Sequence, residues 1–551
     1  MMKEMCLKEE GSGRHMKTQK RSLPEDIRKC LLWILRIAGF SYLILMGVIL
    51  PFYYHPASDY MTIGSCKAEL FNKWGIRTAK VVLGLILLYA VVVLIQQVRE
   101  KRAKKGSFIT GTELFAVCYI VVLCISYWIT DYRDFAKMGA DGWNMGFWPQ
   151  IVFLFFFLFF VHILTPLMAK VGLGLMITAS TGVFLLGLLN RYGINPLKMD
   201  SSGPGFISTI GNINWYCGYW SVLFPLSCGL FVFCETAKKQ QWLKWLCGIA
   251  SAVGFATGVS QGSDSGLLVL AGLILLLGWL AGEKTEWLCN FLKLLFLFSL
   301  TLLLLFVVQH TFPDRNQYLT SGYLLLVNTP LGFLSAALVL TVYAILFWKK
   351  ERETIIRIFA GSLKILVFAA MGLLIIYIVL LIYNTLHPGK IAFLAGNPLF
   401  TFDEKWGSFR GATWTIGFHT FFAQDFSHRL FGVGPDSMAA YLYDGKNATL
   451  LQEVRSVFGD KRLTNAHGEW ITVLVDTGLM GLLSFASMIV SGIASLLEKK
   501  QNVLCKICAV SIFCYTLHNM FSFEQMMNIS QMYLVLGIGF SLFKKEKEEG
   551  S

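Results

Sequence analysis

Residues 358–384 read IFAGSLKILVFAAMGLLIIYIVLLIYN, and Lys364 is the single charged side chain among them. A helix needs about 20 mostly apolar residues to cross the hydrocarbon layer of a bilayer, so this segment is long enough to span a membrane. The whole chain of 551 residues has a similar character, with 55% hydrophobic and 15% charged residues. Soluble domains carry about 25% charged residues. A water-soluble globular fold is therefore excluded.

Apolar runs of this kind, separated by charged or polar clusters, occur about fourteen times along the chain. They cover residues 30–53, 79–98, 108–130, 146–168, 171–189, 214–234, 243–260, 265–281, 287–308, 324–348, 358–384, 470–496, 503–520 and 526–543. The pattern predicts an all-α, polytopic transmembrane helical bundle. We expect a basic leader at 1–29, membrane regions at 30–384 and 469–543, a large loop at 385–468 and a short tail at 544–551.

The net charge of +14 follows this topology. If the leader is cytoplasmic, the connections on the same side hold the basic clusters at 99–105, 238–244, 349–357, 499–500 and 544–547. This is the positive-inside pattern, so the charge indicates orientation and contact with anionic lipid, and no nucleic-acid partner is expected. Four basic residues on an outer connection run against the pattern: Lys67, Lys73, Arg77 and Lys80.

The loop at 385–468 is then extracytoplasmic, with both termini cytoplasmic. Connections of this length are uncommon unless they are functional, and its mixed charges favour a small helical cap. The cysteines lie mostly in apolar runs, so no disulfide framework is implied. Cys505 and Cys508 form a C-x-x-C inside one such run, which indicates buried side chains rather than a metal or redox pair.

The sequence Thr464–Trp470, TNAHGEW, leads directly into the span at 470–496. Asn465 suits a helix N-cap, and Glu469 suits the first turn. His467 is then expected at the mouth of a helix N-terminus, a place that attracts phosphate and disfavours a charged imidazole. It is either a general base or an interfacial histidine that binds a loop carbonyl.

The stretch from His467 to Leu482 resembles the signature of the O-antigen ligase and polymerase superfamily, in which a histidine precedes a Gly-x-x-Gly pair at this spacing. The pair here is Gly478 and Gly481. Three further segments are similar to motifs of the family: FGVGPD at 431–436 with Gly432 and Gly434, RGATW at 410–414, and the stretch 211–226 with Asn212. Gly468 stands where the family commonly has an amide or hydroxyl residue, and Gly205 where it often has Arg.

The resemblance implies a GT-C-like fold and an enzyme of the bacterial cytoplasmic membrane. Such an enzyme moves a glycan from undecaprenyl-pyrophosphate to an acceptor hydroxyl on the outer side, by inverting transfer without a metal or other cofactor. The acceptor is a glycan, lipid or protein, so ligase and polymerase remain open. The alternative is a flippase or transporter for lipid-linked oligosaccharide. Transporters often have two similar halves and ionisable groups at mid-membrane, whereas the polar candidates here gather in one outer loop.

In this interpretation His467 takes the proton of the acceptor, and Arg410 binds the pyrophosphate with its fork of donors. The alternative for Arg410 is an ion pair with Asp403 or Glu404. Trp414, which lies on the same helical stripe as Arg410, and Asn212 are also candidates for substrate binding. Further candidates for substrate binding are Arg191, Arg455, Lys461 and Arg462. The alternative for Arg191 is an interfacial anchor. The alternative for the other three is a solvated run of charges.

Other polar residues are weaker candidates. His419 and His428 have no carboxylates at metal-ligand spacing, so no metal site is predicted there. His518 and Asp264 are possible members of the site, with capping or interfacial roles as alternatives. The Phe-rich run at 153–160 suits either a groove for the lipid tail or an ordinary lipid-facing helix.

Overall fold

The computed structural model describes residues 23–56, 58, 62–100, 108–199, 205–233, 241–313, 328–348, 352–498 and 502–549. Most of the leader at 1–29 and the basic residues at 101–105, 238–239, 349–350 and 499–500 lie outside this described part. The first half of the chain forms α1 (Leu23–Ile44), the π-helical turn η1 (Leu45–Ile49), α2 (Leu50–Phe52), α3 (Ile63–Leu70), the π-helical turn η2 (Phe71–Gly75), α4 (Ile76–Glu100), α5 (Gly111–Ile129), α6 (Arg133–Met138), α7 (Phe147–Ile163), α8 (Pro166–Arg191), α9 (Ile213–Phe233), α10 (Gln241–Ser260) and α11 (Asp264–Ala281).

The second half forms α12 (Thr285–Thr311), α14 (Leu331–Trp348), α15 (Arg352–Leu386), the short 3-10 turn η5 (Ala392–Leu394), α16 (Trp406–Ala423), α17 (Phe426–Phe431), α18 (Met438–Tyr443), α19 (Ala448–Phe458), α20 (Glu469–Leu496), α21 (Val503–Met520) and α22 (Met526–Glu549). The described strands are β1 (Phe206–Ile207) and β2 (Gly211–Asn212), an antiparallel pair of two residues each. The all-α prediction is therefore confirmed.

Each of the expected spans falls on a helix. Within the described residues, 12 helices are long and apolar enough to cross a membrane, which makes this a multi-pass membrane protein. The remaining two expected spans coincide with the shorter apolar helices Phe147–Ile163 and Leu331–Leu346. The number of crossings therefore remains a prediction.

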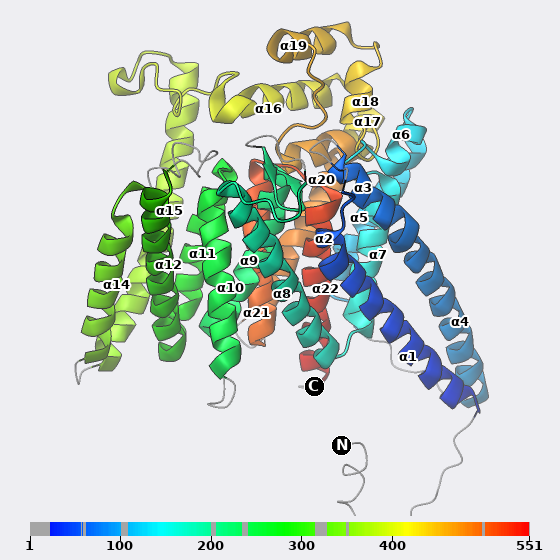
Figure 1. The fold of residues 1–551 in the computed structure, drawn as a ribbon. Coiled ribbons are helices and arrows are strands. Elements are labelled where there is room, and N and C mark those ends of the chain that lie inside the picture. The colour runs from blue at the N-terminus through cyan, green and yellow to red at the C-terminus, as the bar shows by residue number, and fades with distance from the viewer. Residues whose placement is uncertain are drawn as a thin grey trace, which may run out of the picture.

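The helices differ in how far they are enclosed. α9 and α22 are buried along nearly their whole length, and α21 packs against both of them. α4 and α15 expose most of their apolar side chains at the margins of the bundle (Figure 1), which is the pattern of lipid-facing helices. The centre of the bundle is thus built from helices of the middle and the C-terminal part of the chain.

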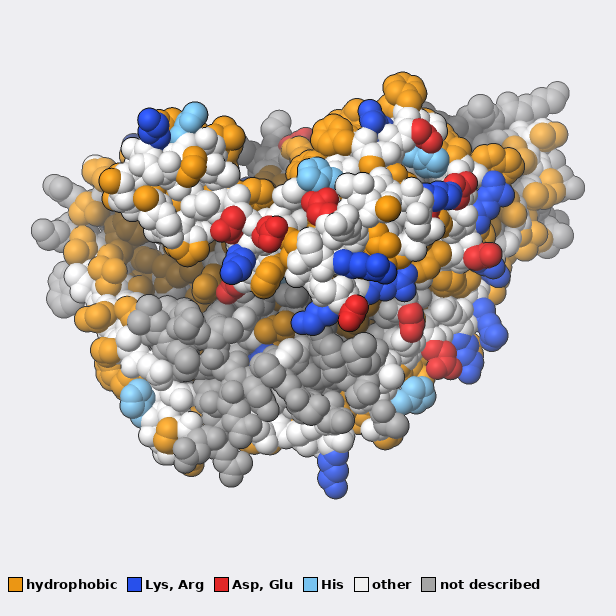
Figure 2. Space-filling model, turned by 90° about the horizontal axis from the view of Figure 1, so that it is seen from above, with side chains coloured by type: hydrophobic (Ala, Val, Ile, Leu, Met, Phe, Trp, Pro, Cys, Tyr) orange, Lys and Arg blue, Asp and Glu red, His pale blue; other side chains and the backbone are white. Residues whose placement is uncertain are grey.

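The segment 387–468 lies across one end of the bundle. Figure 1 shows α16 and α19 running over the ends of the long helices, while α22 ends at the opposite side. A separate apolar cluster holds this cap together; it includes Ile416, Met438 and Leu450 of the cap and Val475 of α20. Seen from above in Figure 2, acidic and basic side chains are intermingled on this face. The loop is thus folded into helices that pack on the start of α20.

Lys67, one of the residues that run against the charge pattern, is buried. Its ammonium donates to the carbonyls of Leu50, Pro51 and Tyr53 at 2.9, 3.1 and 2.8 Å. These carbonyls lie at the end of the first membrane helix, where the last carbonyls lack the partner four residues further on that a continuing helix would supply. The charge of Lys67 therefore caps a helix end, which explains its place on that connection.

The Phe-rich run of α7 packs inside the protein. Phe153, Phe156, Phe157 and Phe160 are all buried. Phe156 stacks on Tyr42 of α1 with ring centroids 3.3 Å apart, and α7 lies along α22. The expectation of a lipid-tail groove or a lipid-facing helix at 153–160 is therefore wrong, because neighbouring helices cover these rings. Cys505 and Cys508 are buried free thiols, as expected.

A buried ion pair joins α5 to α22 at the end of the bundle remote from the cap. Glu113 Oε1 lies 2.9 Å from Lys544 Nζ and 2.8 Å from His162 Nε2. Its other oxygen accepts from the backbone N–H and the hydroxyl of Thr110, which caps α5. Both charged side chains are nearly inaccessible, at 4% and 3% exposure, so each charge depends on the other.

We expect Lys544→Met to destabilise the protein by about 3–5 kcal/mol, because it removes the ammonium from the buried Glu113 carboxylate and leaves only the His162 ring beside that oxygen. The matched control is Lys547→Met on the same helix. Lys547 forms an exposed pair with Glu498, and its loss should cost only about 0–1 kcal/mol. Thermal unfolding of the purified protein in detergent measures both variants. Equal shifts for the two would contradict this prediction.

Candidate active site

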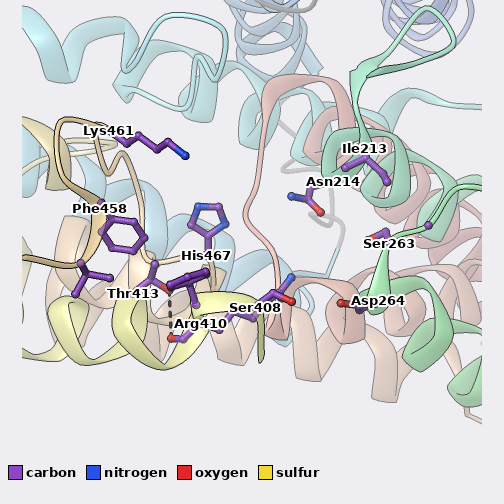
Figure 3. A pocket seen from close by; sticks show the side chains of 13 residues that line it. Ile213, Asn214, Ser263, Asp264, Ser408, Arg410, Thr413, Phe458, Lys461 and His467 are labelled. Carbon is purple, nitrogen blue, oxygen red and sulfur yellow. Dashed lines mark hydrogen bonds between the residues drawn. The ribbon is translucent and has the colours of Figure 1, made fainter. Parts of the chain in front are cut away.

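A cavity of about 490 Å³ lies where the cap meets the membrane helices. Its wall contains residues from the starts of α9, α11 and α16, from the end of α19 and from the segment before α20: Ile213, Asn214, Gly262, Ser263, Asp264, Ser408, Phe409, Arg410, Thr413, Val457, Phe458, Lys461 and His467. Figure 3 shows Asn214, Ser263 and Asp264 on one side, Lys461 and Phe458 on the other, and His467 and Arg410 between them. The structure thus brings the two foremost sequence candidates into one cavity.

Arg410 follows a strained turn. Gly407, Ser408 and Phe409 adopt left-handed backbone angles, with φ of 59°, 61° and 70°, which interrupt α16. Left-handed conformations cost roughly 1–2 kcal/mol for a residue with a side chain. Such strain concentrates at functional sites. Both strained side-chain-bearing residues line the cavity, so the strain lies in its wall.

The guanidinium of Arg410 is fixed by backbone acceptors. Its Nε donates to the carbonyl of Phe521 and one terminal nitrogen donates to the carbonyl of Gly407, both at 2.6 Å. In the described part of the chain it forms no ion pair with Asp403 or Glu404, the alternative considered from the sequence. Burial lowers the pKa of Arg410, and the nearby Asp264 partly offsets this effect. The group still stays charged, because arginine titrates only at very high pH.

His467 has a left-handed backbone, with φ of 50°. Its N–H donates to Asn465 Oδ1 at 2.9 Å, so Asn465 closes an Asx turn. The N-cap of α20 is Gly468, which makes the expected N-cap role of Asn465 wrong. The imidazole packs edge-on against Phe523, with ring centroids 5.0 Å apart. Burial, and secondly the charge of Arg410, lower the pKa of His467 to about 4, so the ring is neutral at neutral pH.

The loop between α21 and α22 holds both candidates in place. Phe521 supplies the carbonyl for Arg410, and Phe523 packs against His467. Glu469 lies in the first turn of α20 as predicted; its carboxylate accepts the N–H of Glu524 at 2.7 Å, and its own N–H donates to the carbonyl of Ser522. Sequence reasoning missed this role of the loop. The one available signal is its position between the last two spans, on the side of the cap.

Two motif glycines allow close contact between backbones. α20 is broken at Gly478, which has φ of 70°, and Gly432 has φ of 78°. A Cβ at Gly432 would lie 2.1 Å from the carbonyl of Asp476, and one at Gly478 would lie 2.3 Å from the backbone of Leu430. Only glycine fits such positions, by both angle and space. The Gly-rich turn at 431–436 is thus docked on the broken helix.

The other motif glycines are also confined. A Cβ at Gly434 would lie 2.6 Å from the Thr130 hydroxyl oxygen, and one at Gly481 would lie 2.0 Å from that of Thr477. A Cβ at Gly468 would lie 2.7 Å from the indole nitrogen of Trp414. The amide or hydroxyl residue expected at Gly468 by the family resemblance is therefore replaced here by close packing against Trp414.

Three predicted substrate-binding residues lie outside the wall of this cavity. Trp414 packs in a cluster with Trp406 and Phe521, at centroid distances of 5.4 and 5.6 Å. Arg191 is 2% exposed and donates to the carbonyl of Gln261 at 2.6 Å, so it supports the turn that precedes Ser263. Asn212 lies in β2, where its side chain accepts the N–H of Asn214. Asn214, two residues further on in the same motif, reaches the cavity instead.

The three basic residues before His467 differ in whether they line the cavity. Lys461 lines the cavity, whereas Arg455 is exposed on α19 and Arg462 stacks 5.3 Å from the ring centroid of Tyr443. His419 contacts Glu453, and His428 contacts Asp425, both on the exposed side of the cap. Within the described residues, no group of three or more His, Cys, Asp or Glu side chains is arranged to hold a metal ion.

Behind His467, four carboxylic side chains are buried around a second, much smaller cavity: Asp436, Glu469, Asp476 and Glu524. They accept backbone or side-chain N–H groups from separate segments, and Asp436 accepts those of Ala140 and Met145 at 2.8 and 3.3 Å. Burial raises the pKa of Asp436 to about 7, against the opposing effect of these two N–H donors. The carboxyl groups therefore join the connection before α7 to the cap and to α20.

Comparison with known families agrees with this site. The family model described as O-Antigen ligase matches residues 317–486. This match covers 170 of the 551 residues and supports the resemblance of the chain to the O-antigen ligase and polymerase superfamily. No curated protein matches the chain. The segment matched to O-antigen ligase contains Arg410, His467, Gly432 and Gly478, so the resemblance of these motifs is confirmed at the level of the family. The opposite cavity wall, including Asn214 and Asp264, lies outside the match.

The raised pKa of Asp436 predicts a pH-dependent stability. Its folded-state pKa of about 7 exceeds the ordinary 3.8, so the folded protein holds a proton that the unfolded chain releases. The contribution of protonated Asp436 to the free energy of unfolding is complete below about pH 4 and is lost as the pH rises through about 7. We therefore expect the melting temperature to fall from about pH 5 to about pH 7, and Asp436→Asn to reduce that fall.

The matched control is Asp425→Asn in the same cap. Hydrogen bonds to the backbone N–H of His428, to Ser427 and to the His428 ring keep the pKa of Asp425 well below its usual range, so it does not titrate in this window. Thermal unfolding of detergent-solubilised protein across this pH range measures the effect. A slope that is unchanged in Asp436→Asn would contradict the prediction.

Proposed function

We propose that this protein transfers a glycan from undecaprenyl-pyrophosphate to an acceptor hydroxyl at the outer face of the bacterial cytoplasmic membrane. The observation that carries the proposal is one cavity with a neutral histidine, His467, and two cationic side chains, Arg410 and Lys461. It lies at the end of the membrane bundle, where a lipid-anchored pyrophosphate can reach it from the bilayer. The match of residues 317–486 to the O-antigen ligase family supports the same reaction class.

In this proposal Arg410 and Lys461 stabilise the leaving group. The bond between the anomeric carbon and the pyrophosphate oxygen breaks, and the pyrophosphate leaves with the electron pair. Fixed positive charges that face the developing negative charge lower the barrier without needing to reorganise. The two backbone acceptors of Arg410 hold its guanidinium in place before substrate arrives.

His467 serves as the general base. The acceptor oxygen forms the new bond to the anomeric carbon from the side opposite the pyrophosphate, which inverts that carbon, and its proton passes to the imidazole. A base with a pKa near 4 is weak at neutral pH. Bound pyrophosphate brings negative charge beside His467 and compensates Arg410, and both effects raise the pKa of the imidazole. The donor thus increases the basicity of the group that activates the acceptor.

A flippase or transporter has less support. Transport through a bundle requires polar groups along the path of the cargo, often at mid-membrane. The charged groups of this cavity come from the cap and from helix ends beside it.

Loss of either principal residue should slow transfer strongly. We expect His467→Ala to lower the transfer rate by about 100-fold or more, since a general base contributes about 10²–10⁴. Arg410→Ala should lower it by about 100-fold or more, because it removes charge from the leaving-group side. Transfer of a fluorescent glycan from an undecaprenyl-pyrophosphate donor in proteoliposomes measures both rates.

Two neighbouring residues of the same types serve as controls. His428 contacts Asp425, and Arg429 donates to the carbonyl of Phe422, both away from the cavity. His428→Ala and Arg429→Ala should keep near-normal rates. Normal transfer by His467→Ala or Arg410→Ala would refute their catalytic assignment.

The proposal requires the cap to face outward and the two termini to face the cytoplasm. An epitope inserted at Gly445, an exposed turn between α18 and α19, should bind antibody on bacterial cells whose outer layer has been removed. An epitope placed after Ser551 should bind only once the membrane is permeabilised. The reverse pattern would place the cavity in the cytoplasm and overturn the mechanism.

A further inference from the structure

Glu469, in the first turn of α20, binds the loop before α22 at two points. Its carboxyl oxygen Oε2 accepts the N–H of Glu524 at 2.7 Å, and its own N–H donates to the carbonyl of Ser522 at 2.8 Å. Glu469 is 6% exposed, so both contacts are shielded from water. Ser522 and Glu524 are the two neighbours of Phe523 in the chain. The two hydrogen bonds therefore fix the backbone on either side of Phe523.

Phe523 in turn covers part of the His467 imidazole. Its ring is 3% exposed and stands edge-on to the imidazole, with an interplanar angle of 88° and ring centroids 5.0 Å apart. Trp143 also packs on Phe523, with centroids 6.0 Å apart. His467 thus lines the cavity and is backed by an apolar ring. This apolar cover contributes to the burial that lowers the pKa of His467 to about 4.

The loop is attached independently beyond residue 524. The side chain of Gln525 and the N–H of Met526 donate to the carbonyls of Gly142 and Trp143 at 2.9 and 3.0 Å. These contacts do not involve the carboxyl group of Glu469, so they remain when that group is replaced. Loss of the carboxyl group should therefore displace the aromatic ring at 523 and leave the loop folded.

The carboxyl group of Glu469 faces a cavity that disfavours charge. The smaller, second cavity is lined by Glu469, Asp436, Asp476, Glu524 and the hydroxyl-bearing Tyr119, and its described lining residues include no Lys, Arg or His. A charge that is buried beside three other carboxyl groups without a cation is strongly disfavoured. Glu469 therefore accepts the N–H of Glu524 as a neutral group, a role that the amide oxygen of Gln can also fill.

We propose that Glu469 is a positioning residue for His467 and acts through Phe523: its two hydrogen bonds keep the aromatic ring against the imidazole and so fix the orientation of the base. This inference rests on the proposed function, in which His467 takes the proton of the acceptor. A base must lie within hydrogen-bond reach of that proton, and a misplacement of about 1 Å can cost about 100-fold in rate. Glu469 does not itself touch the substrate.

Chemical modification of His467 tests this role without relying on turnover. Diethyl pyrocarbonate acylates the neutral imidazole, and peptide mass spectrometry of the full-length protein in nanodiscs quantifies the product at this residue. The wild-type ring is neutral at pH 5 and at pH 7, so its modification rates, corrected for decay of the reagent, should be nearly equal. In Glu469→Leu water reaches the ring and its pKa rises toward the ordinary 6.5, so the rate at pH 7 should exceed that at pH 5 by about 3- to 10-fold.

A conservative variant separates the hydrogen bond from the charge. Glu469→Gln keeps an acceptor oxygen, so it should retain nearly equal modification rates at the two pH values and a glycan transfer rate within about 3-fold of wild type. Glu469→Leu should lower the transfer rate by about 10- to 100-fold. The matched control is Glu453→Leu in α19. Glu453 contacts His419 on the exposed side of the cap, so its loss should leave both measurements unchanged.

Phe523→Leu tests the same link from its other end. This variant removes the aromatic ring but keeps the hydrogen bonds of the neighbouring backbone, so it should change the modification of His467 in the same direction as Glu469→Leu. The double variant should be no more affected than Glu469→Leu alone, because the two residues act through one contact. Melting temperatures identify any variant that fails to fold, and if Glu469→Leu fails, Phe523→Leu decides in its place.

Each outcome bears on a different claim. If Glu469→Leu and Phe523→Leu fold and keep the wild-type modification and transfer rates, the positioning role is wrong. If Glu469→Gln behaves like Glu469→Leu, the position of His467 depends on a charge, and the neutral hydrogen bond is wrong. If the modification rates change as expected but wild-type protein transfers no glycan, the proposed function fails and the link from Glu469 to His467 stands.

Discussion

The break in α20 at Gly478 determines how the cap is attached to the membrane bundle. An unbroken helix would bond its own carbonyls internally, but here the carbonyls of Val475 and Asp476 accept the N–H groups of Val433 and Gly434 at 3.1 and 3.0 Å. Gln424 and Ser126 donate to the same two carbonyls. Four segments therefore meet at one interrupted turn of helix. The start of α20, and with it His467, is held in a fixed relation to the cap by this contact.

The site depends on that attachment because its parts come from distant positions in the chain. Arg410 lies on α16, which packs on α20. Its side chain donates a hydrogen bond to the carbonyl of Phe521 in the loop before α22. His467 precedes α20 and rests on Phe523 of the same loop. A single loop between the last two helices thus fixes the distance between the cationic group and the imidazole. The buried carboxyl groups around Glu469 join this loop to the rest of the cap.

The sequence predicts the helices well because the information is local. An apolar run such as 358–384 can be recognised as a membrane span without knowledge of its neighbours, and each expected run falls on a helix. His467 and Arg410 were predicted through motif spacing and lie in one cavity. The failures concern tertiary contacts. Asn465 was expected as a cap, but the left-handed backbone of His467 shifts the helix start to Gly468. The composition of the Phe-rich run at 153–160 is compatible with contact with lipid, and the packing of α1 and α22 over it depends on tertiary contacts that composition does not reveal. Asn214, and not Asn212, reaches the cavity, because the Asn212 side chain accepts the N–H of Asn214 at the start of α9.

The origin of the two cavity walls has a consequence for chimeras in which a segment of this protein is exchanged with that of a relative. Residues 317–486 carry the match to O-antigen ligase, and they contain the histidine and both cations. The opposing wall comes from α9 and α11, and the support for both candidates comes from the loop at 521–524. Transplanting the matched segment into another protein that carries this family match would therefore move His467, Arg410 and Lys461 without the wall that faces them. Such a chimera would combine these three side chains with the host's own opposing wall. In this protein the two walls of the cavity are encoded in separate stretches of the chain, and each is open to change without the other.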